Sequence, residues 1–142
     1  MKRLILLILA ILPLTALAQD ATFEKLMNEY SSKPHCTTIN ISKTMLRSMG
    51  VEMGADSVKA IAIEDSSLIE KAKTQIAELV TAYEVVMEVN SENERVNIYQ
   101  LANAKGETTD LIITTISANE CVILYIKGHD IEVGDATALF NF

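Results

Sequence analysis

The sequence of 142 residues is poor in the side chains from which active sites and metal centres are built, with only two histidines and two cysteines. Histidine is the commonest general acid or base, and histidine and cysteine are the usual zinc ligands. The chain also has no glycine-rich phosphate loop, no metalloprotease helix motif and no Ser-x-x-Lys spacing. These absences predict a non-catalytic protein that holds no cofactor and no metal ion.

Linker sequences are absent as well. The two prolines and five glycines are scattered, and no repeat or low-complexity tract divides the chain. The stretch after residue 18 has the ordinary length of one domain and can bury a core without disulfide or metal staples. We therefore expect a single domain over residues 19–142.

Basic residues are in the minority, with 12 lysines and arginines against 19 aspartates and glutamates and a net charge of −7. Binding to nucleic acid or to an anionic lipid surface requires clusters of lysine and arginine. The acidic balance argues against both kinds of partner, and scattered acidic residues are typical of a solvated surface.

The one long apolar run lies at the start of the chain and is typical of a secretory signal peptide over residues 1–18. Lys2 and Arg3 precede the apolar residues 4–14, and a small-residue cleavage motif ends at Ala18. The run is shorter than the stretch of about 20 residues that crosses a bilayer as a helix. We expect cleavage between Ala18 and Gln19, with an uncleaved N-terminal anchor as the alternative.

Cleavage at this site predicts an exported protein, periplasmic or extracellular. We expect no transmembrane segment after cleavage, because no later apolar run is long enough to cross a membrane. Loss of Lys2 and Arg3 from the 12 basic residues leaves 10 against 19 acidic residues, a net charge of −9. The mature domain is thus expected to be strongly acidic.

Two helices and a strand are predicted at the start of the domain. Residues 20–32 carry apolar side chains at intervals of three and four, as in an amphipathic helix, and residues 36–41 alternate, as in a half-buried strand. Ser42 follows the strand and can cap a helix over residues 43–49, after which Gly50 provides a stop. Capping explains this serine without a chemical role.

A second strand is predicted over residues 58–63, and the longest helix follows it, beginning with Ser67-x-x-Glu70 as a capping box. After residue 83 the apolar period changes to two, which is typical of antiparallel strands separated by turns. The predicted strands are residues 84–89, 95–101, 110–117 and 121–127, and a short closing helix is expected over residues 130–142.

This order of elements predicts an α+β fold. It consists of a late four-stranded antiparallel meander plus two earlier short strands, packed by an N-terminal helix, one long amphipathic helix and short helices. The sequence does not specify how the two early strands pair.

An export signal, a strand leading into ISKTMLRSM, a capped amphipathic helix and a terminal meander together resemble a known family. That family is a domain of unknown function of small exported proteins from Bacteroidetes. The resemblance covers essentially the whole mature chain, and its most recognisable part is residues 39–49. It implies an envelope or extracellular α+β domain and brings no assigned activity, cofactor or catalytic residue.

The two histidines and two cysteines are His35, Cys36, Cys121 and His129, a set that by number alone suggests a Cys2His2 metal site. Cys121 and His129 flank one predicted strand, where eight residues at about 3.3 Å each separate them by roughly 26 Å. Zinc ligands lie about 2–2.3 Å from their shared ion, so the strand excludes a four-ligand site.

Cys36 and Cys121 can instead form a disulfide or stay as two free, partly buried thiols. An exported protein meets an oxidising compartment, and each cysteine opens a predicted strand, so pairing of those strands would bring them together. Because disulfide geometry is demanding and the strand neighbours are not specified, both alternatives stay open.

One face of the predicted sheet is the candidate for binding. It presents tyrosines and isoleucines among polar groups, a composition suited to docking. The alternative is that a helix, such as the N-terminal one, covers this face. The expected members of the face are Arg95, Asn97, Tyr99, Ile123 and Tyr125.

The preferred hypothesis is a non-catalytic exported protein that binds an envelope protein or a ligand. The first alternative is an enzyme whose site is assembled from the distant residues Ser42, His35 and His129. The second is a structural or adhesive component that self-associates through an edge of the meander. A pocket with histidine, carboxylate and hydroxyl groups would favour the enzyme, and a long uncharged edge strand would favour assembly.

Overall fold

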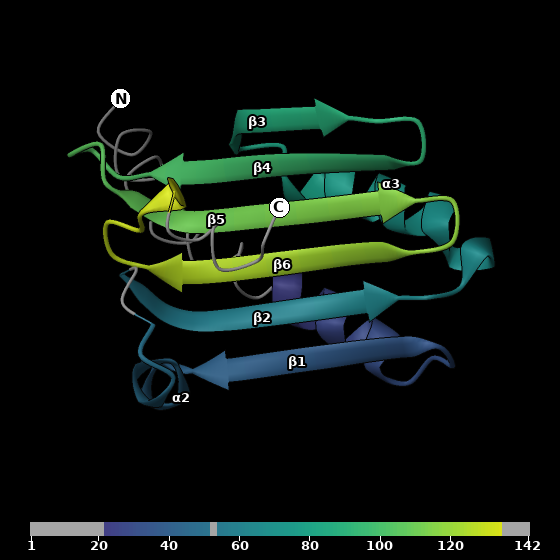
Figure 1. Ribbon diagram of the computed structural model, residues 1–142, viewed down its shortest axis with the longest axis horizontal. Helices are drawn as coiled ribbons and strands as arrows, with labels where there is room; N and C mark the ends of the chain where they lie inside the picture. Colours follow the sequence, from purple (N-terminus) through teal and green to yellow (C-terminus); the bar gives the residue numbers. More distant parts are fainter. Residues whose placement is uncertain (1–21, 52–53, 135–142) are drawn as a thin grey trace, which may run out of the picture.

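The computed structural model describes residues 22–51 and 54–134, in which six strands form one antiparallel sheet (Figure 1). The strand order is β1-β2-β6-β5-β4-β3, so the last four strands follow one another and the two early strands extend the sheet beyond β6. The predicted α+β class is confirmed, and the pairing that the sequence left open places β2 beside β6. The strands are β1 Cys36–Ser42, β2 Ala55–Ile63, β3 Glu84–Asn90, β4 Glu94–Ala102, β5 Thr108–Ser117 and β6 Cys121–Gly128.

Two helices cover one face of this sheet. They are the N-terminal helix over residues 22–31 and α3 (Ile69–Leu79), both behind the sheet in the view of Figure 1. A 3-10 turn, η1 (Ser66–Leu68), leads into α3, and the short helix α2 (Lys43–Ser48) follows β1 at the sheet edge.

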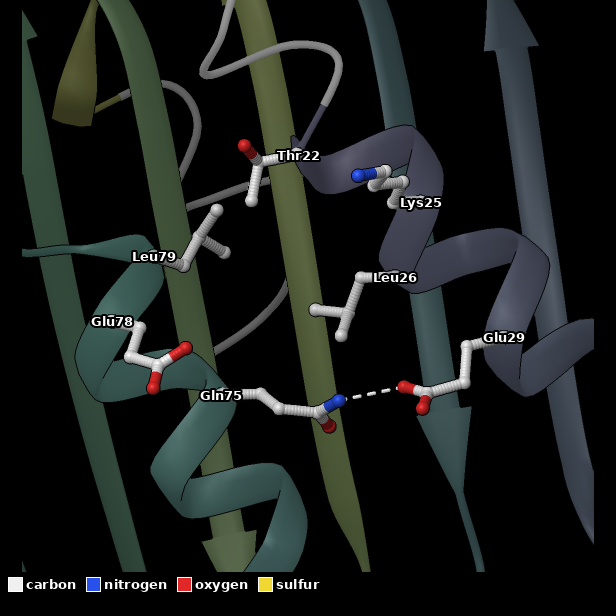
Figure 2. A pocket seen from close by; sticks show the side chains of 7 residues that line it. All are labelled: Thr22, Lys25, Leu26, Glu29, Gln75, Glu78 and Leu79. Carbon is white, nitrogen blue, oxygen red and sulfur yellow. Dashed lines mark hydrogen bonds between the residues drawn. The ribbon is translucent and has the colours of Figure 1, made fainter.

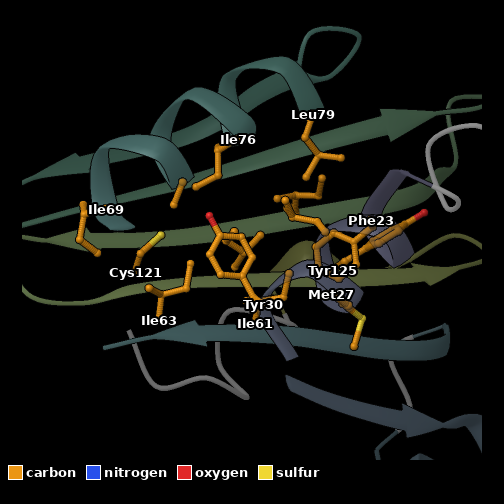
Figure 3. Close-up of a cluster of buried hydrophobic side chains, with 14 residues drawn as sticks. Phe23, Met27, Tyr30, Ile61, Ile63, Ile69, Ile76, Leu79, Cys121 and Tyr125 are labelled. Atoms are coloured by element: carbon orange, nitrogen blue, oxygen red, sulfur yellow. The ribbon is translucent and has the colours of Figure 1, made fainter. Parts of the chain in front are cut away.

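The main core lies between these two helices and the sheet (Figure 3). The rings of Phe23 and Tyr125 meet edge-on with 5.0 Å between their centroids, and such pairs add about 0.5–1.5 kcal/mol beyond the burial of their area. The apolar spacing of the N-terminal helix is confirmed, because all four of its apolar positions are buried. The buried members of this cluster are Phe23, Leu26, Met27, Tyr30, Ile61, Ile63, Ile69, Ala72, Ile76, Leu79, Ile112, Cys121, Ile123 and Tyr125.

The opposite face of the sheet is apolar as well, since β2, β5 and β6 are hydrophobic on both sides. Leu46 of α2 and Ile131, which follows β6, pack into this second cluster. The closing helix expected over residues 130–142 begins at residue 133, and its residues after 134 lie outside the described chain. The sheet members of the second cluster are Val58, Ala60, Ile98, Leu111, Ile113, Leu124 and Ile126.

The two covering helices are joined by a polar bridge. Gln75 Nε2 donates to Glu29 Oε2 at 2.6 Å, Lys71 Nζ donates to Glu29 Oε1 at 3.0 Å, and the Tyr30 hydroxyl donates to Gln75 Oε1. The hydrogen bond from Gln75, followed by that from Lys71, lowers the pKa of Glu29 from its ordinary 4.5. Because the folded state favours the ionised carboxylate, the bridge contributes its full stability at pH values above the ordinary pKa of 4.5, which applies to the unfolded chain. This contribution is lost as the pH falls through the lower pKa that Glu29 has in the folded protein.

The start of the long helix differs from the prediction. Asp65 Oδ1 accepts the backbone N–H of Ser67 at 3.0 Å and its hydroxyl at 2.7 Å, so aspartate caps a 3-10 turn ahead of α3. α3 then begins at Ile69, and no side chain in the described part of the chain caps it. The prediction of a capping box formed by Ser67 and Glu70 is therefore wrong, because the Ser67 hydroxyl donates its hydrogen bond to Asp65, two residues upstream.

Within the described ranges, no helix combines the length and the apolar character needed to cross a membrane. The predicted signal peptide and the cleavage site between Ala18 and Gln19 lie outside these ranges.

Candidate binding groove

A groove runs beside α3, where the helix layer ends before the sheet does. The sheet residues buried under the helices come from β2, β5 and β6, and all seven residues of the edge strand β3 are exposed. The groove measures about 1020 Å³ and is lined by α3, by β4 and by the turns that follow β3 and β5. It is larger than the hollow between the two helices that is described below.

The lining combines apolar side chains with groups that form hydrogen bonds. Ile69 and Ile76 of α3, with Tyr99 and Ile116 from the sheet, supply apolar surface. Three glutamates, one lysine and one arginine add charges of both signs. Asparagine amides donate and accept hydrogen bonds at once, and serine hydroxyls do the same. The uncharged polar residues include Asn90, Ser91, Asn93, Asn97, Ser117 and Asn119.

Asn97 and Tyr99 project from the same face of β4, and Asn97 Nδ2 donates to the Tyr99 hydroxyl at 2.9 Å. Asn97 lies directly opposite Thr114 of β5, which is fully buried. Asn97 Oδ1 and Thr114 Oγ1 are both buried without a hydrogen-bond partner in the described part of the chain. Because an unpaired buried polar atom costs about 1–3 kcal/mol, this neighbourhood favours the arrival of a polar group.

The structure divides the binding face that the sequence predicted. Arg95, Asn97 and Tyr99 line the groove. Ile123 and Tyr125, at 0% and 2% exposure, lie in the main core beneath the helices and are not available to a partner. At β6 the alternative prediction, that a helix covers this face, therefore holds. The helices end before the outer part of β4, so the residues of that strand stay accessible in the groove.

The groove residues that the turns and α3 contribute were not predicted from the sequence. In an antiparallel meander every second turn falls at the same end of the sheet, so the β3–β4 and β5–β6 turns lie together. The polar residues Asn93 and Asn119 of these turns were recognisable from this rule. The contribution of Lys73 was not, because it depends on where α3 lies over the sheet.

A smaller hollow of about 390 Å³ lies between the two helices (Figure 2). Leu26 and Leu79 face it from opposite sides, and the hydrogen bond between Glu29 and Gln75 spans it. These groups already bind one another across the gap. The hollow is thus part of the contact between the helices and is less suited to a ligand than the groove.

Cys36 and Cys121 are both free. Ile63 of β2 lies opposite Cys36 on one side and opposite Cys121 on the other, so a whole strand separates the two thiols. Two strand spacings of about 4.8 Å place their Cα atoms roughly 9.6 Å apart, beyond the reach of about 7 Å for a disulfide. The disulfide alternative is wrong because β1 and β6 are not neighbours.

The thiol of Cys121 is expected to be unreactive in the folded protein. Burial raises its pKa to about 11, and burial also raises the pKa of the half-buried Cys36. Since the thiolate is the reactive form, we expect iodoacetamide to label Cys36 slowly at neutral pH and Cys121 only in denaturant, as measured by mass spectrometry. Rapid labelling of Cys121 in native buffer would contradict its position in the core.

The histidines and cysteines are not gathered into one site. His35 precedes β1 and His129 follows β6, and these strands both run antiparallel to β2, so the two histidines lie at opposite ends of the sheet. Residues 22–51 and 54–134 contain no group of three or more histidine, cysteine, aspartate or glutamate side chains that could hold a metal ion.

The residues proposed for an enzyme are likewise divided, with Ser42 and His129 at one end of the sheet and His35 at the other. Asp56, which the sequence did not single out, lies 2.8 Å from His129 Nδ1 through its Oδ2 and 3.4 Å from Lys43 Nζ through its Oδ1. The His129 side chain is 86% exposed. This group is therefore a surface cluster of charges, and neither of the two hollows includes it.

Replacing Ser42 with alanine is expected to lower the free energy of unfolding by about 1 kcal/mol. Ser42 Oγ accepts the backbone N–H of Met45 at 3.3 Å, which confirms the predicted cap of α2. Urea denaturation measures the loss, and Ser42→Asn, which can also cap, is expected to retain most of the stability. A loss of binding or activity in Ser42→Ala without any loss of stability would contradict the capping role.

The fold and groove define a small α+β domain in which two helices lie on a six-stranded antiparallel sheet. The family described as a domain of unknown function, DUF4252, matches residues 30–139, and the chain belongs to this family. The expected membership in a family of unknown function is thereby confirmed, whereas the origin and export of the protein stay predictions. Neither the curated proteins nor the solved structures include a match to the chain.

Proposed function

We propose that this protein is a non-catalytic, exported domain that binds a ligand or partner segment in the groove beside α3. The observation that carries the proposal is the groove itself, about 1020 Å³ in volume with Asn97 and Tyr99 among its lining residues. Binding sites in proteins are typically concave and preformed, with volumes of about 300–1,000 Å³. Export to the periplasm or beyond is supported by the signal-like residues 1–18.

The lining favours a neutral ligand that presents hydrogen-bonding groups beside apolar surface. Ile69 and Ile76 offer apolar contact, and the asparagines and serines of the turns can pair with both donors and acceptors. Three glutamates against two basic residues leave too little net charge to select strongly for a charged ligand. A donor from the ligand that reached Asn97 Oδ1 would satisfy a buried acceptor.

Site-specific photo-cross-linking in cells that naturally produce the protein tests this proposal. A photoreactive amino acid in place of Lys73 lies at the groove, and the same amino acid in place of Lys105, in the turn before β5, is the matched control. Both lysines are exposed, so neither change disturbs the core. We expect a defined adduct from position 73 that is absent from position 105.

A second change shows whether the adduct depends on the groove. Tyr99→Ala, combined with the photoreactive residue at position 73, is expected to remove the adduct while circular dichroism shows a folded protein. Equal adducts from positions 73 and 105, or an adduct that is indifferent to Tyr99, would contradict binding in the groove.

A further inference from the structure

The sheet has two outer strands, and only one of them carries the features that prevent an edge from pairing with another chain. β3 contains an irregularity between Val85 and Met87 and two glutamates, Glu84 and Glu88. Bulges and charged side chains are the usual means by which natural sheets protect an edge. β3 is therefore a protected edge, although it exposes apolar side chains.

β1 has none of these protections. Its sequence, CTTINIS, contains no charged residue, no proline and no glycine, and its register with β2 is regular from Cys36 to Ser42. In the part of the chain that the structure describes, no strand pairs with its outer side (Figure 1). Threonine and isoleucine are also among the residues that favour strands. β1 is thus a regular, uncharged edge that is open to pairing.

We propose that β1 pairs antiparallel with β1 of a second copy of this chain, about a two-fold axis that passes beside Ile39. The pairing would join the two sheets into one continuous sheet. It is independent of the groove, which lies toward the other edge, at β4 and the turn after β3. The occupied groove and the paired edge can therefore coexist.

The register centred on Ile39 matches each side chain with an uncharged partner on the same face. Ile39, which is 49% exposed, lies opposite Ile39 of the second copy. Thr37 lies opposite Ile41 on this face, and Thr38 lies opposite Asn40 on the face that carries the helices. Pairs of β-branched side chains directly across an antiparallel ladder are favourable, and like charges there are unfavourable. This register brings no charges into opposition within the strand.

Charges at the two ends of the paired segment are complementary. In this register Lys43 of one copy lies next to position 35 of the other. Glu64 lies beside His35, since its backbone N–H donates to the His35 carbonyl at 2.8 Å, and Asp65 follows it. The Lys43 side chain is 61% exposed, and its Nζ lies 3.4 Å from Asp56 Oδ1 of its own chain. On pairing it would exchange this exposed ion pair, which contributes little stability, for one with the carboxylates of the second copy. Lys33 lies in the same turn as His35, and its ammonium group is placed over the ring of Tyr30 on the helix side.

Sedimentation equilibrium of the purified protein over about 1 µM to about 1 mM tests the pairing. We expect a dimer whose population rises with concentration. Ile39→Lys places two ammonium groups opposite each other at the axis and is expected to weaken association about tenfold or more. Val89→Lys is the matched control, because Val89 is 45% exposed on the other edge, and it is expected to leave the dimer unchanged.

Monomeric wild-type protein over the whole range would overturn the proposal. A dimer that resists Ile39→Lys, or that is weakened equally by Val89→Lys, would also overturn it. Thermal unfolding of each variant shows that the fold is retained, so a change in association cannot be confused with unfolding.

Disulfide trapping tests the register independently. Directly opposite residues of an antiparallel pair have Cα atoms about 4.5–5.5 Å apart, within reach of a disulfide, so Ile39→Cys is expected to give a covalent dimer under mild oxidation. Asn40→Cys would place its two cysteines diagonally, about 7–8 Å apart, and is expected to give none. Equal trapping at both positions, or trapping only at position 40, would contradict the register.

Discussion

Replacing Tyr125 with alanine is expected to lower the free energy of unfolding by about 3–5 kcal/mol, a large part of the stability of a domain of this size. The Tyr125 side chain is 2% exposed, packs against Phe23 and donates a hydrogen bond to Asp110 Oδ2. Alanine removes the ring from the core and takes a donor from a carboxylate that is itself 8% exposed. Denaturation in urea measures the loss.

Two further variants separate the causes of this loss. Tyr125→Phe keeps the ring and removes the hydroxyl, so it is expected to cost about 1.5–3 kcal/mol, the range for a hydrogen bond to a charged group. Tyr99→Ala, at a half-buried position in the groove, is expected to cost less than Tyr125→Ala. If Tyr125→Ala were as stable as Tyr99→Ala, the helices could not be covering β6.

Replacing Gly128 with alanine is expected to destabilise the protein by about 3 kcal/mol, the upper part of the usual range for overpacking. Gly128 ends β6 where the chain meets the backbone at Gly54. A Cβ atom at position 128 would lie 2.0 Å from the Gly54 carbonyl oxygen and 2.9 Å from Ala55 Cα. Backbone atoms cannot rotate aside as a side chain can, so the ladder between β2 and β6 has to shift.

Gly134→Ala is the control for this substitution, because no atom of the described residues 22–51 and 54–134 lies within 4 Å of a Cβ atom at position 134. We expect the thermal unfolding temperature to fall for Gly128→Ala and to stay unchanged for Gly134→Ala. Similar unfolding temperatures for Gly128→Ala and the wild type would show that the end of β6 and Gly54 are not in contact.

Local features of the fold were predictable from the sequence. The apolar spacing of Phe23, Leu26, Met27 and Tyr30 and the cap at Ser42 each depend on neighbours within about four residues along the chain. The start of the long helix was not predicted, because Ser67 matched a capping pattern while Asp65, just upstream, competed for the same role. Local rules identify which residues can cap a helix and do not decide between two of them.

The face of the sheet that the helices cover was not predictable from alternation. In β5 the consecutive residues Leu111, Ile112 and Ile113 are all buried, and Ile123 and Leu124 in β6 are buried on opposite faces. A strand that is apolar on both sides gives no preferred face. For this reason Ile123 and Tyr125 were assigned to an exposed face, although they belong to the main core.

The pairing of strands that lie far apart along the chain was also not predictable from the sequence. β2 lies beside β6 although about sixty residues separate Ile61 from its partner Ile123. This single pairing separates Cys36 from Cys121 and makes β1 an outer strand. The groove depends on it too, since the helices pack over β2, β5 and β6 and end before the outer part of β4.

The order of the strands therefore determines the core, the separation of the thiols and the open edge, and cross-strand nuclear Overhauser effects report on it directly. We expect backbone contacts that join Ile61 to Ile123 and Ile63 to Cys121, together with contacts between Ile39 and Ala60. Contacts that placed β1 directly beside β6 would bring Cys36 next to Cys121 and would contradict the sheet, the core beneath the helices and the open edge at β1.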